Sequence, residues 1–445
     1  MPTIANRQFL LPLLLIAAVT ACSTRGSSQN TAAVTSPTTN PPAVTKPAAG
    51  TTAAATASPA PAVVPVASTR PLSAKSIVAP DPIKFDDAVD RAGDKLLEDA
   101  KRELASGRRS LVIDPLIDAN TGSQTVSTVK MGLILEALLK RKYPDWTIKR
   151  LSRESLAEKP LLLIGTLTPV NVERAIDTPP DAFRIWLTLI DLNTGRVVSK
   201  NLDRATVNSV NPEPLPFFRN SPTWHKDKTV SAYINSCQVN TEIGDPADPE
   251  YLARLPAAAV INEAMMAYNA DKTQEALRLY TEASKLAEPG DLRVLNGLYL
   301  TNWELGKRDA ARDAFTKIVD SGIDAKKLPV KMLFRTGTTD FESAEDQSAQ
   351  YQMWLNAIAS QTGKSPVCMK VVGHTSRSGS ARTNERLSLR RAEAVTKQLE
   401  GRNRALRSRL SSAGAGSREA LVGLGTDDFR DALDRRVEFR VVDCM

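Results

Sequence analysis

One short stretch of this chain constrains its fold more than any other. Residues 368–374 have the apolar character of a strand, and a turn rich in Gly, Ser and Thr follows over 375–380. A helix is expected to begin near Asn384, with a buried stripe that consists of Ala392, Val395 and Leu399. This order predicts an α/β unit in which the free amides and hydroxyls of the turn can face a ligand.

Arg391 is the charged residue of this unit that the spacing singles out, because it lies two turns into the expected helix. Helical side chains lean toward the N-terminus, so its guanidinium is expected to reach over the 375–380 turn. A planar guanidinium suits a carboxylate, which it can grip with two parallel hydrogen bonds. The pattern therefore predicts a site for a carboxylate at the end of the strand.

Motifs along the last quarter of the chain resemble one known family. They are Val371-Val372-Gly373-His374-Thr375, Leu387-Ser388, Arg391-Ala392 and Asp434-Arg435-Arg436-Val437-Glu438-Phe439. With these motifs at these spacings, residues 330–443 resemble the OmpA-like domain found in OmpA, Pal and MotB. The resemblance implies a C-terminal OmpA-like βαβαβ domain, with an entering strand at 330–334 and a long helix at 344–360.

The resemblance also implies a ligand, the peptidoglycan stem peptide, whose diaminopimelate carries carboxylates and an ammonium. Family members supply an arginine for the carboxylates and an aspartate for the ammonium. The peptidoglycan-binding residues carried over to this chain are Thr375, Ser376, Asn384, Arg391 and Arg436. This sequence departs from the family at Ser376, which occupies the position of the aspartate.

Ser376 can still accept a hydrogen bond from an ammonium, but it brings no charge. A charge-assisted hydrogen bond contributes about 1.5–3 kcal/mol and a neutral one about 0.5–1.5 kcal/mol. The substitution is therefore expected to weaken stem-peptide binding by about tenfold or more. Three outcomes stay open: weakened wall binding, a different ligand such as a modified stem, or a domain kept as a scaffold.

The N-terminus has the anatomy of a secretory signal. Arg7 precedes an apolar run over 9–19 that is too short to span a bilayer, and small residues lead into Cys22. Val19-Thr20-Ala21-Cys22 resembles the lipobox of bacterial lipoproteins, which implies a signal peptide over 1–21 and lipidation of Cys22. Ser23 follows where that family's inner-membrane signal is an aspartate. We therefore expect a lipid anchor in the cell outer membrane, facing the periplasm.

Residues 22–80 are expected to form a disordered tether after the lipidated cysteine. The stretch consists almost entirely of Ala, Thr, Pro, Ser and Val, so it has little that it can bury. It would span roughly 40 Å as a coil and about 180 Å as extended polyproline. Such a segment would hold the folded domains at a variable distance from a membrane.

Residues 81–210 are expected to fold as an α/β sandwich domain. Apolar residues recur at helical spacing over 85–104 and 128–142. Strands are expected at 110–116, 146–151, 161–168, 183–192 and 196–200. Helices and strands in this order, closed by an antiparallel set, argue for the sandwich. The pattern resembles the small α/β domains of envelope assembly lipoproteins such as the LpoB, FlgO and CsgG group.

Residues 211–250 are expected to be an irregular, proline-rich linker, in which the presence of both His225 and Cys237 is read as incidental. Residues 251–325 repeat themselves as helices: Tyr268 is followed 35 residues later by Trp303, in the spacing of tetratricopeptide-like repeats. Two functions stay open for these repeats, a groove for a protein partner and a helical spacer.

Cysteines and charge bear on the remaining possibilities. Cys368 and Cys444 lie at the ends of two expected strands, and a disulfide between them is one of two outcomes, with Cys237 left over. The formal charge of +8 favours anionic partners, and export excludes nucleic acid. No motif for a metal, a cofactor or catalysis is recognised, so neither an enzyme nor a cofactor is expected.

Together these features predict an outer-membrane lipoprotein, multi-domain α+β, that tethers the envelope to peptidoglycan through non-covalent binding of the stem peptide. The alternative is a periplasmic assembly scaffold with a weakened wall-binding site, which recruits a secretion or wall-synthesis machine. Ser376 and a chain longer than a simple tether requires favour the alternative.

Overall fold

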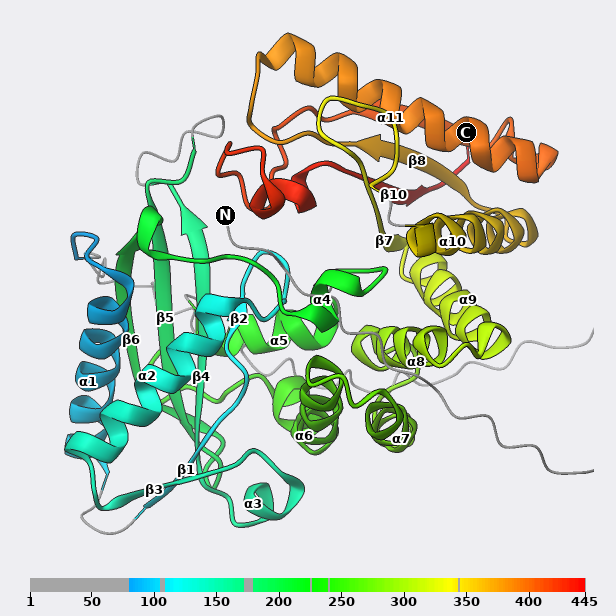
Figure 1. Cartoon of the computed structure of the whole chain (residues 1–445). Helices are drawn as coiled ribbons and strands as arrows, with labels where there is room; N and C mark the ends of the chain where they lie inside the picture. The colour runs from blue at the N-terminus through cyan, green and yellow to red at the C-terminus, as the bar shows by residue number, and fades with distance from the viewer. Residues whose placement is uncertain are drawn as a thin grey trace, which may run out of the picture. The chain divides into compact units, whose positions relative to one another are not determined.

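A computed structural model describes residues 80–104, 109–171, 179–224, 226–238, 241–342 and 345–444 (Figure 1). The expected signal peptide, Cys22, the tether and His225 lie outside these residues. The described fold is mixed α+β and contains two sheets, joined along the chain by a helical region. Within the described residues, no helix is both long and apolar enough to cross a bilayer.

The first sheet mixes parallel and antiparallel pairing. Its strands follow the order β3-β1-β4-β5-β6, and β2 also pairs with β4. β1, β3 and β4 run parallel, and β4, β5 and β6 are antiparallel neighbours. The bounds are β1 Arg109–Ile113, β2 Ile117–Asp118, β3 Trp146–Lys149, β4 Leu161–Val170, β5 Ala182–Asp191 and β6 Arg196–Thr206. The helix and strand order predicted for 81–210 is present.

Helices cover both faces of this sheet. α1 (Phe85–Glu103) and α2 (Val126–Lys142) bury their apolar stripes with strand residues such as Leu163 and Leu187 in one core. α5 (Lys228–Cys237) and the start of α6 (Pro249–Asn269) share a second core with strand residues such as Leu162 and Trp186. Alternate residues of β4 thus face opposite layers, as strand geometry requires. The short α3 spans Arg153–Ala157.

The segment 211–250 departs from the irregular linker that the sequence predicts. It contains α4 (Pro216–Asn220) and α5. Pro216 begins α4, a position where its missing N–H costs nothing, and the Asp227 side chain caps α5 by accepting from the Val230 amide. α5 buries Tyr233 and Cys237 against the sheet, so this part of the segment belongs to the α/β domain.

Four consecutive helices follow, as the periodicity of 251–325 predicts. They are α6, α7 (Thr273–Ala283), α8 (Leu292–Glu304) and α9 (Arg308–Asp324). Tyr280 and Phe315, which occupy equivalent positions of the two repeats, are both fully buried. Gly297 lets α8 approach the ring of Tyr280, because an added Cβ there would lie 2.2 Å from a ring carbon. A small residue thus lets α7 and α8 pack closely at this point.

The C-terminal sheet has the strand order β7-β10-β8-β9. Its strands are β7 Lys327–Leu333, β8 Cys368–Gly373, β9 Leu410–Gly414 and β10 Arg436–Val442, and its helices are α10 Glu345–Lys364 and α11 Ala381–Arg402. β9 is one strand more than the βαβαβ pattern predicts. Leu410 lies opposite Met369 in parallel pairing with β8, so β9 extends the sheet at its edge.

A disulfide closes one end of this sheet. β8 and β10 are antiparallel neighbours with Val442 opposite Cys368, so Cys444 lies just beyond the same end. The Cα atoms of Cys368 and Cys444 are 5.0 Å apart and their sulfurs are bonded. Cys237 is the cysteine left over, a buried free thiol. Burial raises its pKa to about 11, so it is not an activated nucleophile.

Candidate functional site

The turn after β8 is held against α11 by two glycines. An added Cβ at Gly373 would lie 1.9 Å from the carbonyl oxygen of Ser388, and one at Gly414 would lie 2.6 Å from the Ser388 hydroxyl. The two glycines face each other across the parallel pair β8 and β9. They let the helix backbone come close to the strand ends, which fixes where α11 begins relative to the turn.

Asn384 fastens the turn to the first turn of α11. Its amide donates to the carbonyl oxygens of Ser376 (3.3 Å) and Ser378 (2.8 Å). The Ser380 side chain caps the helix by accepting from the Thr383 amide. The turn is therefore pre-shaped by the Asn384 side chain and by the Ser380 cap. Thr375, by contrast, has a buried hydroxyl without a hydrogen-bond partner among the described residues.

Arg391 reaches the turn from α11, but it lies inside the domain with no exposed surface. Its three guanidinium nitrogens each donate to a backbone carbonyl at 2.9 Å, those of Thr338, His374 and Arg335. The guanidinium carbon also lies 5.2 Å from the ring centroid of Phe334. Burial, and then the nearby charge of Arg435, lower the pKa of Arg391 to about 10, so it stays cationic at neutral pH.

Asp427 brings a carboxylate to Ser376, where the family has an aspartate. The Ser376 hydroxyl donates to Asp427 Oδ1 at 2.8 Å, and Nη1 of Arg435 lies 3.3 Å from the same oxygen. The Asp427 side chain keeps 26% of its surface exposed. Its φ of 57° is in the left-handed region, which aspartate tolerates better than most residues. Asp427 thus lies half-buried in the loop between β9 and β10 and contacts the 375–380 turn.

Arg436, which the resemblance also assigns to the binding site, lies apart from this group. Its Nε lies 3.4 Å from Glu438 Oε2, and its guanidinium carbon lies 4.7 Å from the ring centroid of Trp224. The preceding residue, Arg435, lies just before β10, and its Nη1 lies 3.3 Å from Asp427 Oδ1. The site thus receives the first arginine of the pair.

Arg436 belongs to a second cluster, around His374. The ligand atoms of His374, Glu419 and Glu438 lie within 4.8 Å of one another, a grouping that a metal ion would suit. Arg436 contacts Glu438, and Arg440 contacts both carboxylates. Burial alone would raise the pKa of Glu438, but His374, whose Nε2 lies 3.2 Å from Glu438 Oε1, and the charge of Arg436 lower it overall. These contacts explain the grouping as an ion-pair cluster.

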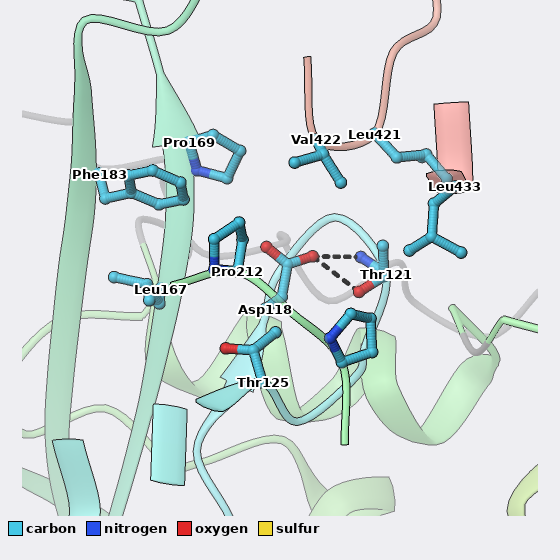
Figure 2. A pocket seen from close by; sticks show the side chains of 11 residues that line it. Asp118, Thr121, Thr125, Leu167, Pro169, Phe183, Pro212, Leu421, Val422 and Leu433 are labelled. Atoms are coloured by element: carbon cyan, nitrogen blue, oxygen red, sulfur yellow. Dashed lines mark hydrogen bonds between the residues drawn. The ribbon is translucent and has the colours of Figure 1, made fainter. Parts of the chain in front are cut away.

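A small pocket is lined by residues of the α/β domain and by Leu421, Val422 and Leu433 (Figure 2). Asp118 accepts from the amide and the hydroxyl of Thr121, both at 2.8 Å, and Leu421 and Val422 approach from the opposite side. The cavity leaves about 20 Å³ for the centres of water molecules, which is room for about one water. We assign it no ligand. The amide of Asn120 donates to the Leu421 carbonyl at 3.3 Å, so the α/β domain supports the loop that contains Leu421.

The structure thus joins Asn384 to Ser376 and places the Arg391 guanidinium on the His374 carbonyl, just before the turn. It adds Asp427 and Arg435, which sequence reasoning missed as site residues. The sequence shows an acidic pair, Asp427-Asp428, shortly before the final strand. Only the fold shows that this loop closes on the 375–380 turn.

Comparison with known proteins gives one match to a family. Residues 333–432 match the sequence model of the OmpA family, so the C-terminal domain is an OmpA-family domain. A comparison with curated proteins gives no match.

Several solved structures are similar over about a quarter of the chain. The peptidoglycan-associated lipoprotein of Burkholderia pseudomallei is 24% identical, with 25% of this chain and 89% of that chain covered and a TM-score of 0.22. The cell wall anchor of the T6SS from Pseudomonas aeruginosa is 21% identical, with 29% and 97% covered and a TM-score of 0.22. The LpoB C-terminal domain from Salmonella enterica is 11% identical, with 27% and 98% covered and a TM-score of 0.21.

Proposed function

We propose that this protein binds peptidoglycan through its C-terminal domain, and that Asp427 receives the ammonium group of the stem peptide. The observation that carries the proposal is the carboxylate held at the turn by the Ser376 hydroxyl and Arg435. A charge-assisted hydrogen bond to an ammonium is roughly twice as strong as a neutral one. Asp427 would therefore restore most of the attraction for the ligand ammonium that is lost when the family aspartate is replaced by Ser376.

In this proposal Arg391 does not contact the ligand directly. Because all three of its nitrogens donate to backbone carbonyls and it has no exposed surface, it is a positioning residue. It joins the loop after β7 to the end of β8, and its positive charge favours a ligand carboxylate close to that loop. The ammonium of the ligand would thus face the Asp427 carboxylate, and a ligand carboxylate would lie near the buried Arg391 cation.

The wider role follows from the N-terminal sequence. With Cys22 lipidated and residues 22–80 extended, the domain would connect an outer membrane to the wall without catalysis. This part of the proposal rests on the signal-like residues 1–21 and on the composition of the tether.

The assembly scaffold remains a second candidate, and one observation favours it. Four of the expected ligand residues are nearly inaccessible, with exposed fractions of 2%, 4%, 6% and 0% for Thr375, Ser376, Asn384 and Arg391. A domain that presents so little of its motif could serve mainly to organise its neighbours. The two candidates differ in whether the intact protein associates with the wall.

Co-sedimentation of the purified protein with diaminopimelate-type sacculi tests the proposal. The wild type should pellet, and Asp427→Asn should bind about tenfold more weakly or worse, because the ammonium loses its charged partner. Asp428→Asn makes the same chemical change one residue away and should bind like the wild type. Ser376→Asp alone would place two carboxylates together, so a large gain is not expected from it.

The double variant Ser376→Asp with Asp427→Asn is the sharper test. It returns the carboxylate to the family's position and should regain most of the binding that Asp427→Asn loses. If the wild type does not pellet and the double variant does, this protein has given up wall binding and the scaffold takes its place. Wild-type binding that survives Asp427→Asn would contradict the role of Asp427.

A further inference from the structure

A second cavity lies at the carboxyl end of β1, on the side of the sheet that α5 and α6 cover. Asp114 follows the last residue of β1 and lines this cavity with Tyr233, Tyr251 and Arg293. The space open to the centres of water molecules is about 50 Å³. Both neighbours of β1, β3 and β4, are parallel to it, and ligands of such sheets bind beyond the carboxyl ends of the strands.

Asp114 is a buried carboxylate with one oxygen uncommitted. It is only 6% exposed, and its Oδ2 accepts from the Tyr251 hydroxyl at 2.6 Å. No described group donates to the other oxygen, Oδ1, and that atom is not among the fully enclosed atoms that lack a partner. Because the side chain lines the cavity, Oδ1 can accept a hydrogen bond from a ligand there.

The surrounding charges favour a cation as that ligand. Three carboxylates act on the buried guanidinium of Arg293: Asp291, whose Oδ2 lies 3.2 Å from it, Asp227 and Asp114. The guanidinium of Arg254 is already paired with Glu250. Carboxylates thus outnumber cations around the cavity, so an anionic ligand would be repelled and a cationic one attracted.

The remaining walls limit the cation to a small organic one. Ile117, Val230, Ala258 and Met265 line the cavity with apolar surface. A hydrated metal ion would make no favourable contact with this apolar surface, whereas a short alkyl stem would bury it. We propose that this cavity binds a small primary amine, with its ammonium on Asp114 and its stem against the apolar wall.

Calorimetric titration of the purified protein with three molecules of one shape tests the site. Propylamine, propanol and propionate are of similar size and carry an ammonium, a hydroxyl and a carboxylate, and ligands of this size bind weakly, so millimolar concentrations are needed. Propylamine should bind, and the other two should not. Equal binding of propanol, or any preference for propionate, would overturn the proposal, as would a failure of propylamine to bind.

Two variants separate the site from general effects on folding. Asp114→Asn keeps the size of the side chain and an acceptor for Tyr251, and should weaken propylamine binding at least tenfold. Ala258→Leu fills the cavity from α6 without touching the carboxylate and should abolish binding. Asp87→Asn makes the same change at an exposed position and should leave binding unchanged. Amine binding that persists in Asp114→Asn would rule out the assigned contact.

The dependence on pH gives an independent readout. Burial raises the pKa of Asp114 to about 6, against the hydrogen bond from Tyr251 and the charge of Arg293. Binding should therefore weaken as the pH falls below about 6, while the amine itself stays protonated. Among the other groups here, burial also raises the pKa of Asp227 and Tyr233, whereas Arg293 stays charged. A flat profile between pH 5 and 8 would contradict an ionised Asp114.

Discussion

At the scale of single residues, the OmpA-family domain depends on backbone contacts that leave no room for a methyl group. Gly373 is the clearest case, because its added Cβ would lie 1.9 Å from a backbone oxygen of α11, which cannot rotate away as a side chain could. Strand and helix would have to separate at the turn that carries Ser376. Binding geometry and stability are therefore coupled at this glycine.

Gly373→Ala should lower the free energy of unfolding by about 1–3 kcal/mol or more, the usual cost of overpacking. Denaturant unfolding followed by circular dichroism would measure it. Gly132→Ala, in the middle of α2, has nothing within 4 Å of the added Cβ and should instead stabilise by about 0.5–1 kcal/mol. Equal effects of the two changes would contradict the clash.

Single residues also show where prediction from sequence stops. Arg391 was expected over the 375–380 turn, and its guanidinium lies on the carbonyl of His374, the residue just before that turn. Its burial was not foreseen, because the loop after β7 that covers it is remote in sequence. The roles of Asp427 and of Arg435 rather than Arg436 depend on which loop closes on the turn and how the chain enters β10. Neither is fixed by local spacing.

At the scale of elements, periodicity predicted the long helices and most strands, since amphipathic stripes leave a strong signal. It missed β9 and α5. β9 has few apolar or β-branched residues, and its pairing with β8 makes it a strand. α5 follows several prolines, and the buried surface of the sheet supplies the partner that local sequence does not show. Tertiary packing overrides local preference in both elements.

The disulfide is the contact that fixes two of these elements to each other. It joins the start of β8 to the end of β10 across a sequence separation of 76 residues. Cross-linking a loop of this length restricts the unfolded chain, and removing a native disulfide typically costs about 2–5 kcal/mol. The double change Cys368→Ser with Cys444→Ser should therefore lower the denaturant midpoint of the C-terminal domain.

Reduction provides the matched comparison for this prediction. The wild type in a reducing buffer should unfold at the same denaturant concentration as the double variant, and the double variant should not respond to the reductant. Cys237 should not interfere, because it is buried and burial raises the pKa of its thiol. A wild type that is insensitive to reduction would contradict a stabilising cross-link.

At the scale of the whole described unit, the segment before the helical repeats also contacts the C-terminal sheet. Thr223 pairs with Val330 of β7, and the amide of Lys331 donates to the Pro222 carbonyl at 2.9 Å. The Lys331 ammonium is buried and donates to the Phe218 carbonyl of α4 at 2.8 Å. A buried amine is thus placed where two parts of the chain meet.

Burial lowers the pKa of Lys331 to about 7, well below the value of an exposed lysine. Between about pH 7 and pH 10 the unfolded chain binds this proton and the folded chain does not, so stability should rise with pH across this window. Below pH 7 both the folded and the unfolded chain hold the proton, so the full free-energy cost of burying the Lys331 ammonium remains. A pKa shift of this size corresponds to a loss of folding stability of about 3–6 kcal/mol.

Lys331→Met should therefore stabilise the protein at pH 7 and abolish the rise between pH 7 and pH 10. The methionine fills a similar volume but leaves the Phe218 carbonyl without its donor, which costs about 1–3 kcal/mol, so a net gain of about 1–3 kcal/mol is expected. Denaturant unfolding at a series of pH values would measure both effects. Lys327→Met, an exposed change on the same strand, should keep the wild-type profile. A Lys331→Met protein that is less stable at pH 7 would show that the buried ammonium holds the two parts together by more than it costs.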